Sequence, residues 1–442
     1  MPMSFDASNL RLRMFATLFF LLPCILVPAA CSRGLVGELP AGAETAVSHI
    51  NKDNLLNLLY VTDRAPTASA NGELSFSSFR GRSMSFGSVT LARERSRLLG
   101  PAGQRDASLH VSRTTKLGEF PQSPYPIELT RLGPRRVPAT VTAHIRAAAA
   151  LRGEVSRRLA LAKRKEAVIF IHGYNNSFDD AAKATGKICN TLSAEFVCVL
   201  LSWPAGGSGG AFYGYNIDRE SGEFAVSDMK KAIRIISRTN GVKRLHLIAH
   251  SRGADVLLSA LNQLGMEAYT IRSSPNERYN ISNVVLFASD IDLDVATTKL
   301  FGFVSDPDTP FGAKATPYGL LPPIGSLHLT VYSSPNDKAL ALSSGLFGSV
   351  VRLGRLTSVS SEEADLNVLL KNSQLSGIAD FIEYRGTAGF AGHSYFLSDS
   401  AIQKDLVALL RDRLKAGDPG RPLVEIKRPF WRVLSRNSRP SH

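Results

Sequence analysis

The chain has 442 residues, of which 44% are hydrophobic and 20% are charged, a composition typical of a globular protein and not of a disordered or fibrous one. Its formal net charge is +14, but lysine and arginine are spread along the chain without a nucleic-acid-binding motif, so we expect no nucleic-acid partner. The four cysteines form no CxxC pair and HExxH is absent, so the sequence predicts neither a metal site nor a cofactor.

The N-terminal segment has the layout of an export signal. Two arginines precede an apolar run over residues 14–27, which is too short for a transmembrane helix, and small residues follow it. Cys31 follows two alanines, an arrangement that resembles the cleavage box of bacterial lipoproteins, in which the cysteine carries lipid. We therefore expect residues 1–31 to direct export to the periplasm or to a membrane of a bacterial cell envelope. Plain export without lipid and an uncleaved membrane anchor are the alternatives.

The rest of the chain divides into three parts by composition. Residues 32–57 have the character of a tether, and residues 58–415 contain the apolar runs of a folded domain. Residues 416–442 are rich in Arg and Pro, and we expect them to form a loosely held polar, basic tail.

The first part of the folded domain is less regular than the remainder. Strand-like apolar runs lie at 58–64 and 84–92. Many Pro, Gly and Arg residues between 93 and 138 predict a long irregular connection. The Ala- and Arg-rich segment 139–165 has apolar residues at helical spacing and predicts a helix.

From residue 167 onward, short apolar runs alternate with segments of helical periodicity. Strands that are apolar throughout are buried on both faces, so this alternation predicts a mostly parallel sheet with helices on both faces, the α/β class. Ser177 is expected to cap the first of these helices. The expected strands cover residues 167–173, 197–204, 244–251, 283–290 and 326–334, and the last helix lies near 405–414.

The sharpest local signal is the turn between a strand and a helix around Ser251. Ala249, Ser251 and Gly253 match the pattern of a nucleophile elbow, G-x-S-x-G, with Ala in place of the first Gly. The turn is so tight that its flanking residues must be small. It places the serine at a helix N-terminus, where the helix dipole favours developing negative charge. An ordinary N-cap serine is the alternative, but the strand before and the helix after favour a nucleophile.

A nucleophilic serine needs a base and an acid, which follow it in chain order on such folds. His393 lies in a Gly-flanked loop before the last helix, and we predict it as the base. His328 lies within a strand-like run, where a buried structural histidine is the expectation. For the acid we favour Asp337, in the turn after the last expected strand, with Asp290 or Asp292 as the alternative.

The tetrahedral intermediate of acyl transfer also needs hydrogen-bond donors. The backbone N–H of Arg252, directly after the nucleophile, is one expected donor. The turn that follows the strand at 167–173 supplies the other, for which the N–H of Tyr174 is the candidate. The Arg252 side chain is expected either to point to solvent or to favour anionic substrates.

Several longer motifs occur in a fixed order along the chain. They are VIFIHGYNNSFDDAA, LLSWPAGG, YNIDRESGEF, HLIAHSRG, FASDIDLDV and YSSPNDKALALS. Together they resemble a bacterial group of α/β-hydrolases long catalogued only as a domain of unknown function. The resemblance spans roughly residues 58–414 and implies the α/β-hydrolase fold with a triad of Ser251, Asp337 and His393. The chain has Arg252 where that group usually has Met, and the group itself names no substrate.

Three further expectations concern the surroundings of the site. Tyr215, Asp218 and Ser221 are expected to be polar caps at a helix entry, with lining of the pocket as the alternative. Residues 294–325, rich in Gly and Pro, are the candidate for a lid. The cysteines at positions 189 and 198 either pair in an oxidising compartment or remain buried thiols.

The predicted function is that of a serine hydrolase resembling a carboxylesterase. Its substrate is expected to be a small-molecule or lipid ester, processed through an acyl-enzyme intermediate. One alternative is a non-catalytic binding or scaffold lipoprotein of the cell envelope that has kept the fold. The other is an acyltransferase, which uses the same residues with an alcohol acceptor in place of water.

Overall fold

The structure is a computed structural model of the chain. It describes residues 55–69, 72–94, 108–207, 210–308, 327–347, 351–358, 360, 379–386 and 392–434. The expected export segment with Cys31, and the expected tether up to residue 54, lie outside these ranges. Within them, no helix is both long enough and apolar enough to span a membrane.

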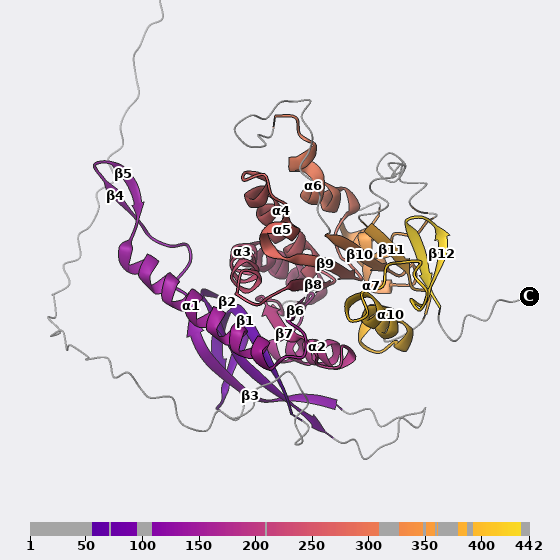
Figure 1. Ribbon diagram of the computed structural model, residues 1–442, viewed down its shortest axis with the longest axis horizontal. Coiled ribbons are helices and arrows are strands. Elements are labelled where there is room, and N and C mark those ends of the chain that lie inside the picture. The colour runs from indigo at the N-terminus through magenta and orange to yellow at the C-terminus, as the bar shows by residue number, and fades with distance from the viewer. Residues whose placement is uncertain are drawn as a thin grey trace, which may run out of the picture. The chain divides into compact units, whose positions relative to one another are not determined.

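An 11-stranded sheet organises the described part of the chain, in the order β12-β13-β11-β10-β9-β8-β6-β7-β1-β2-β3 (Figure 1). All neighbours from β1 to β13 are parallel, whereas β2 and β3 at one edge and β12 at the other are antiparallel to their neighbours. The strands are β1 (Leu55–Ala68), β2 (Leu74–Glu94), β3 (Ser108–Glu119), β6 (Glu166–Ile171), β7 (Val197–Ser202), β8 (Arg244–His250), β9 (Ile281–Phe287), β10 (His328–Ser333), β11 (Ala379–Glu383), β12 (Leu423–Lys427) and β13 (Phe430–Val433).

Helices cover both faces of this sheet, so the predicted mostly parallel α/β architecture is confirmed. One face packs against α1, α3, α4 and α6, and the other against α2, α7 and α10 (Figure 1). The helices are α1 (Pro138–Leu161), α2 (Phe178–Thr191), α3 (Gly210–Ser237), α4 (Gly253–Tyr269), α5 (Pro275–Tyr279), α6 (Leu293–Ser305), α7 (Lys338–Phe347) and α10 (Ser400–Leu410). The expected N-cap of α2 is present, because the Ser177 side chain accepts a hydrogen bond from the backbone N–H of Asp180.

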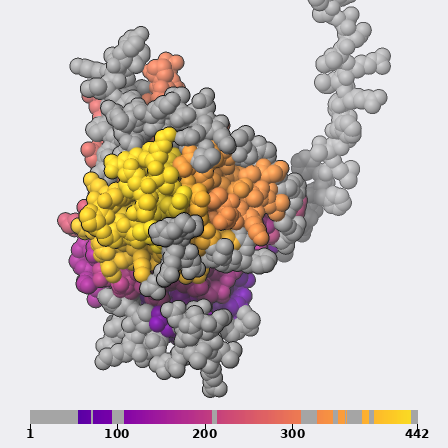
Figure 2. Space-filling view, turned by 90° about the vertical axis from the view of Figure 1, so that its right-hand side faces the viewer, coloured from indigo at the N-terminus to yellow at the C-terminus, as the bar shows by residue number. Residues whose placement is uncertain are grey.

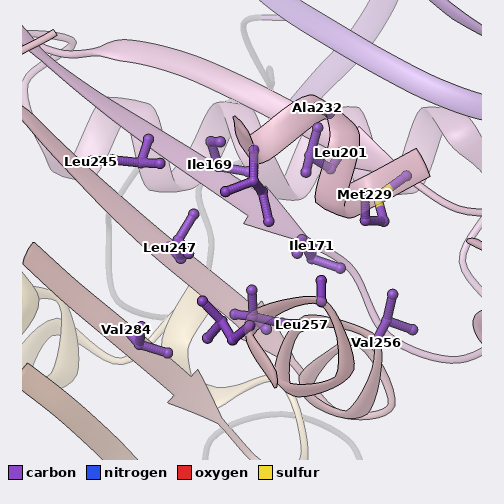
Figure 3. Close-up of a cluster of buried hydrophobic side chains, with 14 of the residues drawn as sticks. Ile169, Ile171, Leu201, Met229, Ala232, Leu245, Leu247, Val256, Leu257 and Val284 are labelled. Atoms are coloured by element: carbon purple, nitrogen blue, oxygen red, sulfur yellow. The ribbon is translucent and has the colours of Figure 1, made fainter. Parts of the chain in front are cut away.

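The two cores follow from the alternation of side chains along each strand. On β6, Ile169 and Ile171 point into the core under α3 and α4, whereas Val168 and Phe170 point into the opposite core. Figure 3 shows the first of these cores, where side chains from β6, β7, β8 and β9 meet those of α3 and α4. Because each fully buried aliphatic side chain contributes about 1.5–3 kcal/mol, two cores of this size stabilise the central strands strongly.

The segment between residues 93 and 138 differs from the irregular connection that its composition predicts. It contains β3, which pairs with the extended β2, and a small ribbon of β4 (Ile127–Thr130) and β5 (Gly133–Arg136). These strands are largely exposed, so they carry polar residues and lack the apolar runs by which the central strands are recognised.

The C-terminal segment is also more ordered than the tail expected from residue 416. It forms β12 and β13, and β13 pairs with β11 and buries Phe430 and Trp431. Figure 2 shows these yellow C-terminal residues beside the orange residues that follow β10. The difference arises because a short hairpin at the edge of a sheet buries only a few apolar side chains. These few residues are hard to recognise in a segment that is otherwise rich in Arg and Pro.

A disulfide joins Cys189 at the end of α2 to Cys198 in β7, so the structure has the paired form of the two cysteine alternatives. Both residues are buried in the core on the α2 side of the sheet. The bond closes a short loop between a helix and the strand that follows it.

Candidate active site

The turn after β8 holds Ser251 in a left-handed backbone conformation, with a φ of 52°. Such a conformation is uncommon for a residue with a side chain and is found where the surrounding structure enforces it. The neighbouring Gly253 explains why small residues flank the turn. A Cβ atom at Gly253 would lie 2.3 Å from the carbonyl oxygen of His172, at the end of β6. The turn therefore has the strand–turn–helix form of a nucleophile elbow.

His393 and Asp337 are brought together although they are far apart in the sequence. His393 Nδ1 lies 2.7 Å from Asp337 Oδ2, and the Asp337 side chain is fully buried. Asp337 follows β10 and is itself held by the backbone N–H of Leu340, which donates to its Oδ1 at 3.0 Å. With Nδ1 directed at a carboxylate, Nε2 of His393 is the nitrogen that remains for proton transfer.

His250 connects this pair to the turn that carries Ser251. Its Nε2–H donates to the backbone carbonyl of His393 at 3.1 Å, and the two imidazole rings lie 4.8 Å apart. The loop is further anchored by Tyr395 and Phe396, which are both buried. Within the described residues, the Ser251 hydroxyl makes no hydrogen bond, and His393 is linked to the turn only through His250. Contacts between a nucleophile and its base are often long before substrate binds.

The turn after β6 lies directly against Ser251. A Cβ atom at Gly173 would be only 2.7 Å from the Cβ of Ser251, which places Gly173 beside the serine side chain. Asp218 and Arg64 hold the shape of this turn. Asp218 accepts the backbone N–H of Asn175 at 2.9 Å, and the Arg64 guanidinium donates to the Asn176 carbonyl at 2.6 Å.

A comparison with families of known proteins identifies the fold. Residues 147–413 match the model of a family described as alpha/beta hydrolases of unknown function (DUF900). The chain belongs to this family. A search of curated proteins finds no match.

Solved structures similar to this alpha/beta hydrolase include several esterases. One is esterase B of Lactobacillus rhamnosis inhibited by a tributyrin phosphonate, with 14% identity, 57% of this chain and 76% of that chain covered, and a TM-score of 0.31. Est1E of Butyrivibrio proteoclasticus has 10% identity, covers 57% of this chain and 89% of its own, and has a TM-score of 0.29. A Pyrobaculum calidifontis esterase has 14% identity, coverage of 56% and 75%, and a TM-score of 0.27. The fold assignment rests on the family match and on the sheet itself.

The Arg252 side chain does not point to solvent. It is buried and forms an ion pair with Asp255 at 2.7 Å. The central carbon of its guanidinium also lies 5.7 Å from the centroid of the Tyr215 ring. Asp255 also pairs with Lys299, so one carboxylate compensates two cations. The expectation of an exposed Arg252 is therefore wrong, because an acid three residues along α4 and an aromatic ring of α3 hold the guanidinium.

The alternative acids serve other purposes in this structure. Asp290 accepts hydrogen bonds from the hydroxyls of Tyr215 at 2.8 Å and Ser343 at 2.7 Å. Burial, with the negative charge of Asp290, raises the pKa of Tyr215 to about 12, which keeps that hydroxyl a donor. Asp292 caps the N-terminus of α6. Neither carboxylate is the partner of His393 Nδ1, whose ring nitrogen lies against Asp337.

Asp218 and Ser221 act within the protein framework. Asp218 is fully buried and accepts backbone N–H groups of Gly206 and Gly207 in addition to that of Asn175, so it joins two loops at the edge of the site. Ser221 is buried and accepts a hydrogen bond from Arg80 at 3.1 Å.

His328 occupies a different environment from the one expected. It is the first residue of β10, its side chain is 25% exposed, and its Nε2 lies 2.7 Å from Asp380. The expectation of a fully buried histidine is wrong because the residue stands at the end of its strand, where one side of the imidazole reaches solvent. His328 and Asp337 flank the same strand at opposite ends.

The candidate lid at 294–325 is described only in part. Its first residues form α6, which ends at Ser305, and residues 309–326 lie outside the described ranges. In the part of the chain that the structure does describe, no group of three or more His, Cys, Asp or Glu side chains is placed to hold a metal ion.

Arg64 is the site residue that sequence reasoning missed. It is buried in β1, and its donors also reach the Ala205 carbonyl at 2.9 Å and the Ser202 hydroxyl at 2.8 Å, which tie β1 to the loop after β7. Burial lowers the pKa of this guanidinium to about 10, so it stays charged at neutral pH. Arg64 lies within a strand, and its role is visible only once the loops that it joins are in place.

Proposed function

We propose that this chain is a serine hydrolase acting on carboxylic esters, in the manner of a carboxylesterase. The observation that carries the proposal is the 2.7 Å contact of His393 Nδ1 with Asp337. The backbone of His393 is in turn hydrogen-bonded to His250, the residue before Ser251. A buried carboxylate in this position orients the imidazole and stabilises its protonated form. Small-molecule or lipid esters are the substrate class.

The proposed reaction begins with attack of Ser251 Oγ on the ester carbonyl carbon, while His393 Nε2 takes the hydroxyl proton. Backbone N–H groups of Arg252 and Tyr174 hold the negative oxygen of the tetrahedral intermediate. The intermediate collapses, the C–O bond to the alcohol breaks, and His393 returns the proton to the leaving oxygen. Water then attacks the acyl-enzyme by the same route and releases the carboxylic acid.

We also propose that the chain is exported to the cell envelope, with lipid on Cys31 as its anchor. The supporting observations are the N-terminal apolar run followed by Cys31 and the disulfide between Cys189 and Cys198. Disulfides persist in oxidising compartments such as the periplasm and are rare in the reducing cytosol. Palmitate labelling of the wild-type chain and of Cys31→Ser in a bacterial host tests the anchor, and equal labelling of both would contradict it.

The enzymatic proposal is tested by labelling the folded protein with a fluorophosphonate, which reacts with an activated serine. Labelling should disappear in Ser251→Ala and His393→Ala. It should fall by about 10³- to 10⁴-fold in rate in Asp337→Asn, because the imidazole loses its orienting charge. His328→Ala is the matched control, since this histidine also faces an aspartate, and its labelling should persist.

The opposite results would decide against the proposal. An unlabelled wild type that unfolds cooperatively would favour the non-catalytic envelope protein. A larger loss in Asp290→Asn than in Asp337→Asn would transfer the role of the acid to Asp290.

A further inference from the structure

A cavity lies at the amino ends of the central strands, whereas Ser251 follows the carboxyl end of β8. It has a volume of about 520 Å³ and is lined by residues at the amino ends of β8 and β9 and by the chain after α10. Strand β8 runs from Arg244 at this cavity to His250 beside Ser251. At about 3.3 Å per residue, the cavity and the serine lie roughly 20 Å apart. A ligand in this cleft is therefore remote from the site of ester hydrolysis.

The lining of the cleft carries an excess of positive charge. Four cations, Lys243, Arg244, Arg413 and Lys415, face a single lining carboxylate, that of Glu277. The Glu277 side chain already accepts a hydrogen bond, at 3.2 Å, from the backbone N–H of Ser274, the N-cap residue of α5. In the described ranges of the chain, no carboxylate forms an ion pair with Lys243, Arg244 or Lys415.

Arg413 is fixed in the wall of the cleft by a buried acid. Its guanidinium contacts Glu166, the first residue of β6, which also lies 2.9 Å from the His246 Nε2. Burial alone would raise the pKa of Glu166, but the hydrogen bonds from His246 and Arg413 outweigh it and lower this pKa to about 2. Glu166 is therefore ionised and pairs with Arg413, whereas the other three cations have no such carboxylate partner among the described residues.

The asparagine and serine side chains of the cleft are bonded to other groups of the protein, so its cations are the groups offered to a ligand. Asn283 donates its amide to His246 Nδ1 at 2.9 Å, which holds the neutral form of this buried imidazole, and the Ser282 hydroxyl donates to the Asn280 carbonyl at 3.5 Å. Burial is the main reason why the pKa of His246 is lowered. Glu166 acts in the opposite direction, and the charges of Arg244 and Arg413 add to the lowering.

We propose that this cleft binds a polyvalent oxyanion of the phosphate class, held by Lys243, Arg244 and Lys415. Like charges gathered in one concavity repel one another, and an anion relieves that repulsion while gaining charge-assisted hydrogen bonds. Guanidinium and ammonium groups are those that proteins use for phosphate, and the volume lies within the usual range for small-ligand pockets. The proposal does not rest on the hydrolase activity.

The first experiment titrates pyrophosphate into the full chain by calorimetry at constant ionic strength. In Lys243→Gln/Arg244→Gln the affinity should fall by at least about tenfold, because two charged donors are lost. Arg113→Gln/Arg146→Gln is the matched control, since it removes two exposed cations from β3 and α1, outside the cleft. Its affinity should equal that of the wild type.

Three results would overturn the proposal: no binding to the wild type, no loss in the cleft variant, or an equal loss in the control variant. The last would show a general effect of net charge. If the double variant fails to fold, Lys415→Gln replaces it, because that exposed side chain lies in a loop, and a smaller loss of affinity is expected.

A second experiment distinguishes a soluble phosphate from a lipid headgroup. The same proteins are sedimented with vesicles of phosphatidylglycerol or of phosphatidylcholine. Sedimentation with phosphatidylglycerol that falls in the cleft variant, but not in the control, would assign the phosphate to a lipid. Pyrophosphate binding without such a difference would assign it to a soluble ligand. Binding by neither probe would leave the cleft without the proposed function and so contradict the inference.

Discussion

The histidine before Ser251 is placed to position the base of the proposed reaction. His250 donates through Nε2–H to the His393 carbonyl, and its ring also packs 4.8 Å from the Phe396 ring. Burial, followed by the nearby charge of His393, lowers the pKa of His250 well below its usual range. His172 is the other titratable group that lowers it. His250 therefore stays neutral and keeps its proton on Nε2, where the bond to the base loop needs it.

Replacement of His250 by Phe should retain the ring packing and lose this donor. We expect kcat for p-nitrophenyl acetate to fall by about 10- to 100-fold, with KM little changed, because a displaced base slows the chemical step more than binding. His250→Gln, whose amide nitrogen reaches a similar position, should recover most of the activity. Equal losses in the two variants would show that the hydrogen bond is not the cause.

At the residue scale, the sequence was informative where a chemical role demands a residue type at a particular place in the fold. The expected acid and base do lie together. They could be chosen because Asp337 follows a recognisable strand and His393 precedes a recognisable helix. Asp218 and Arg64 were not assigned to the loops that they hold, because their partners are backbone groups of other segments. Such bonds leave no trace in local sequence patterns.

Two glycines illustrate how the same residue type has opposite effects in different elements. Gly153 lies within α1, and a Cβ atom there would meet no other atom within 4 Å. Gly153→Ala should therefore stabilise the protein by about 0.5–1 kcal/mol, since glycine costs conformational entropy in a helix. Gly253→Ala, at the start of α4, should destabilise it by at least about 1–3 kcal/mol, because the methyl group would collide with the backbone of β6.

Chemical denaturation of the two variants and the wild type measures both effects. Gly253→Ala should also slow fluorophosphonate labelling, because the clash separates α4 from β6 at the turn that carries Ser251. Labelling in Gly153→Ala should be unchanged. A stable and fully reactive Gly253→Ala would mean that the turn is less tightly packed than the structure shows.

At the element scale, sequence patterns found the central strands β6 to β10 but missed the buried β11 and the exposed β3. The strands β6 to β10 are apolar runs, and their expected positions agree with the structure to within a few residues. In β3 most side chains are exposed, so its polar residues gave no run to detect. The pairing of β3 with β2 is set by contacts distant in sequence, which periodicity does not report.

At the scale of the whole molecule, the C-terminal hairpin of β12 and β13 is an integral part of the folded sheet. Arg421, which precedes the hairpin in the chain, is fully buried with its Nε 2.8 Å from the carboxylate of Asp405 in α10. The Tyr332 hydroxyl of β10 also contacts Asp405, so the three residues form one buried polar group. Removing the arginine leaves the carboxylate buried without its cation, and breaking a buried pair in this way costs about 3–5 kcal/mol.

Truncation after residue 415 should therefore unfold the protein or lower its free energy of unfolding by at least about 3–5 kcal/mol, because it removes Arg421 and uncovers the apolar side chains under β13. Truncation after residue 434 keeps β12 and β13 and should leave the stability unchanged. Urea denaturation followed by tryptophan fluorescence and circular dichroism compares the two. Arg421→Met in the full chain distinguishes the loss of the buried cation from the loss of the pairing between β13 and β11. If this variant is as stable as the wild type, the lost strand pairing accounts for the effect of truncation after residue 415.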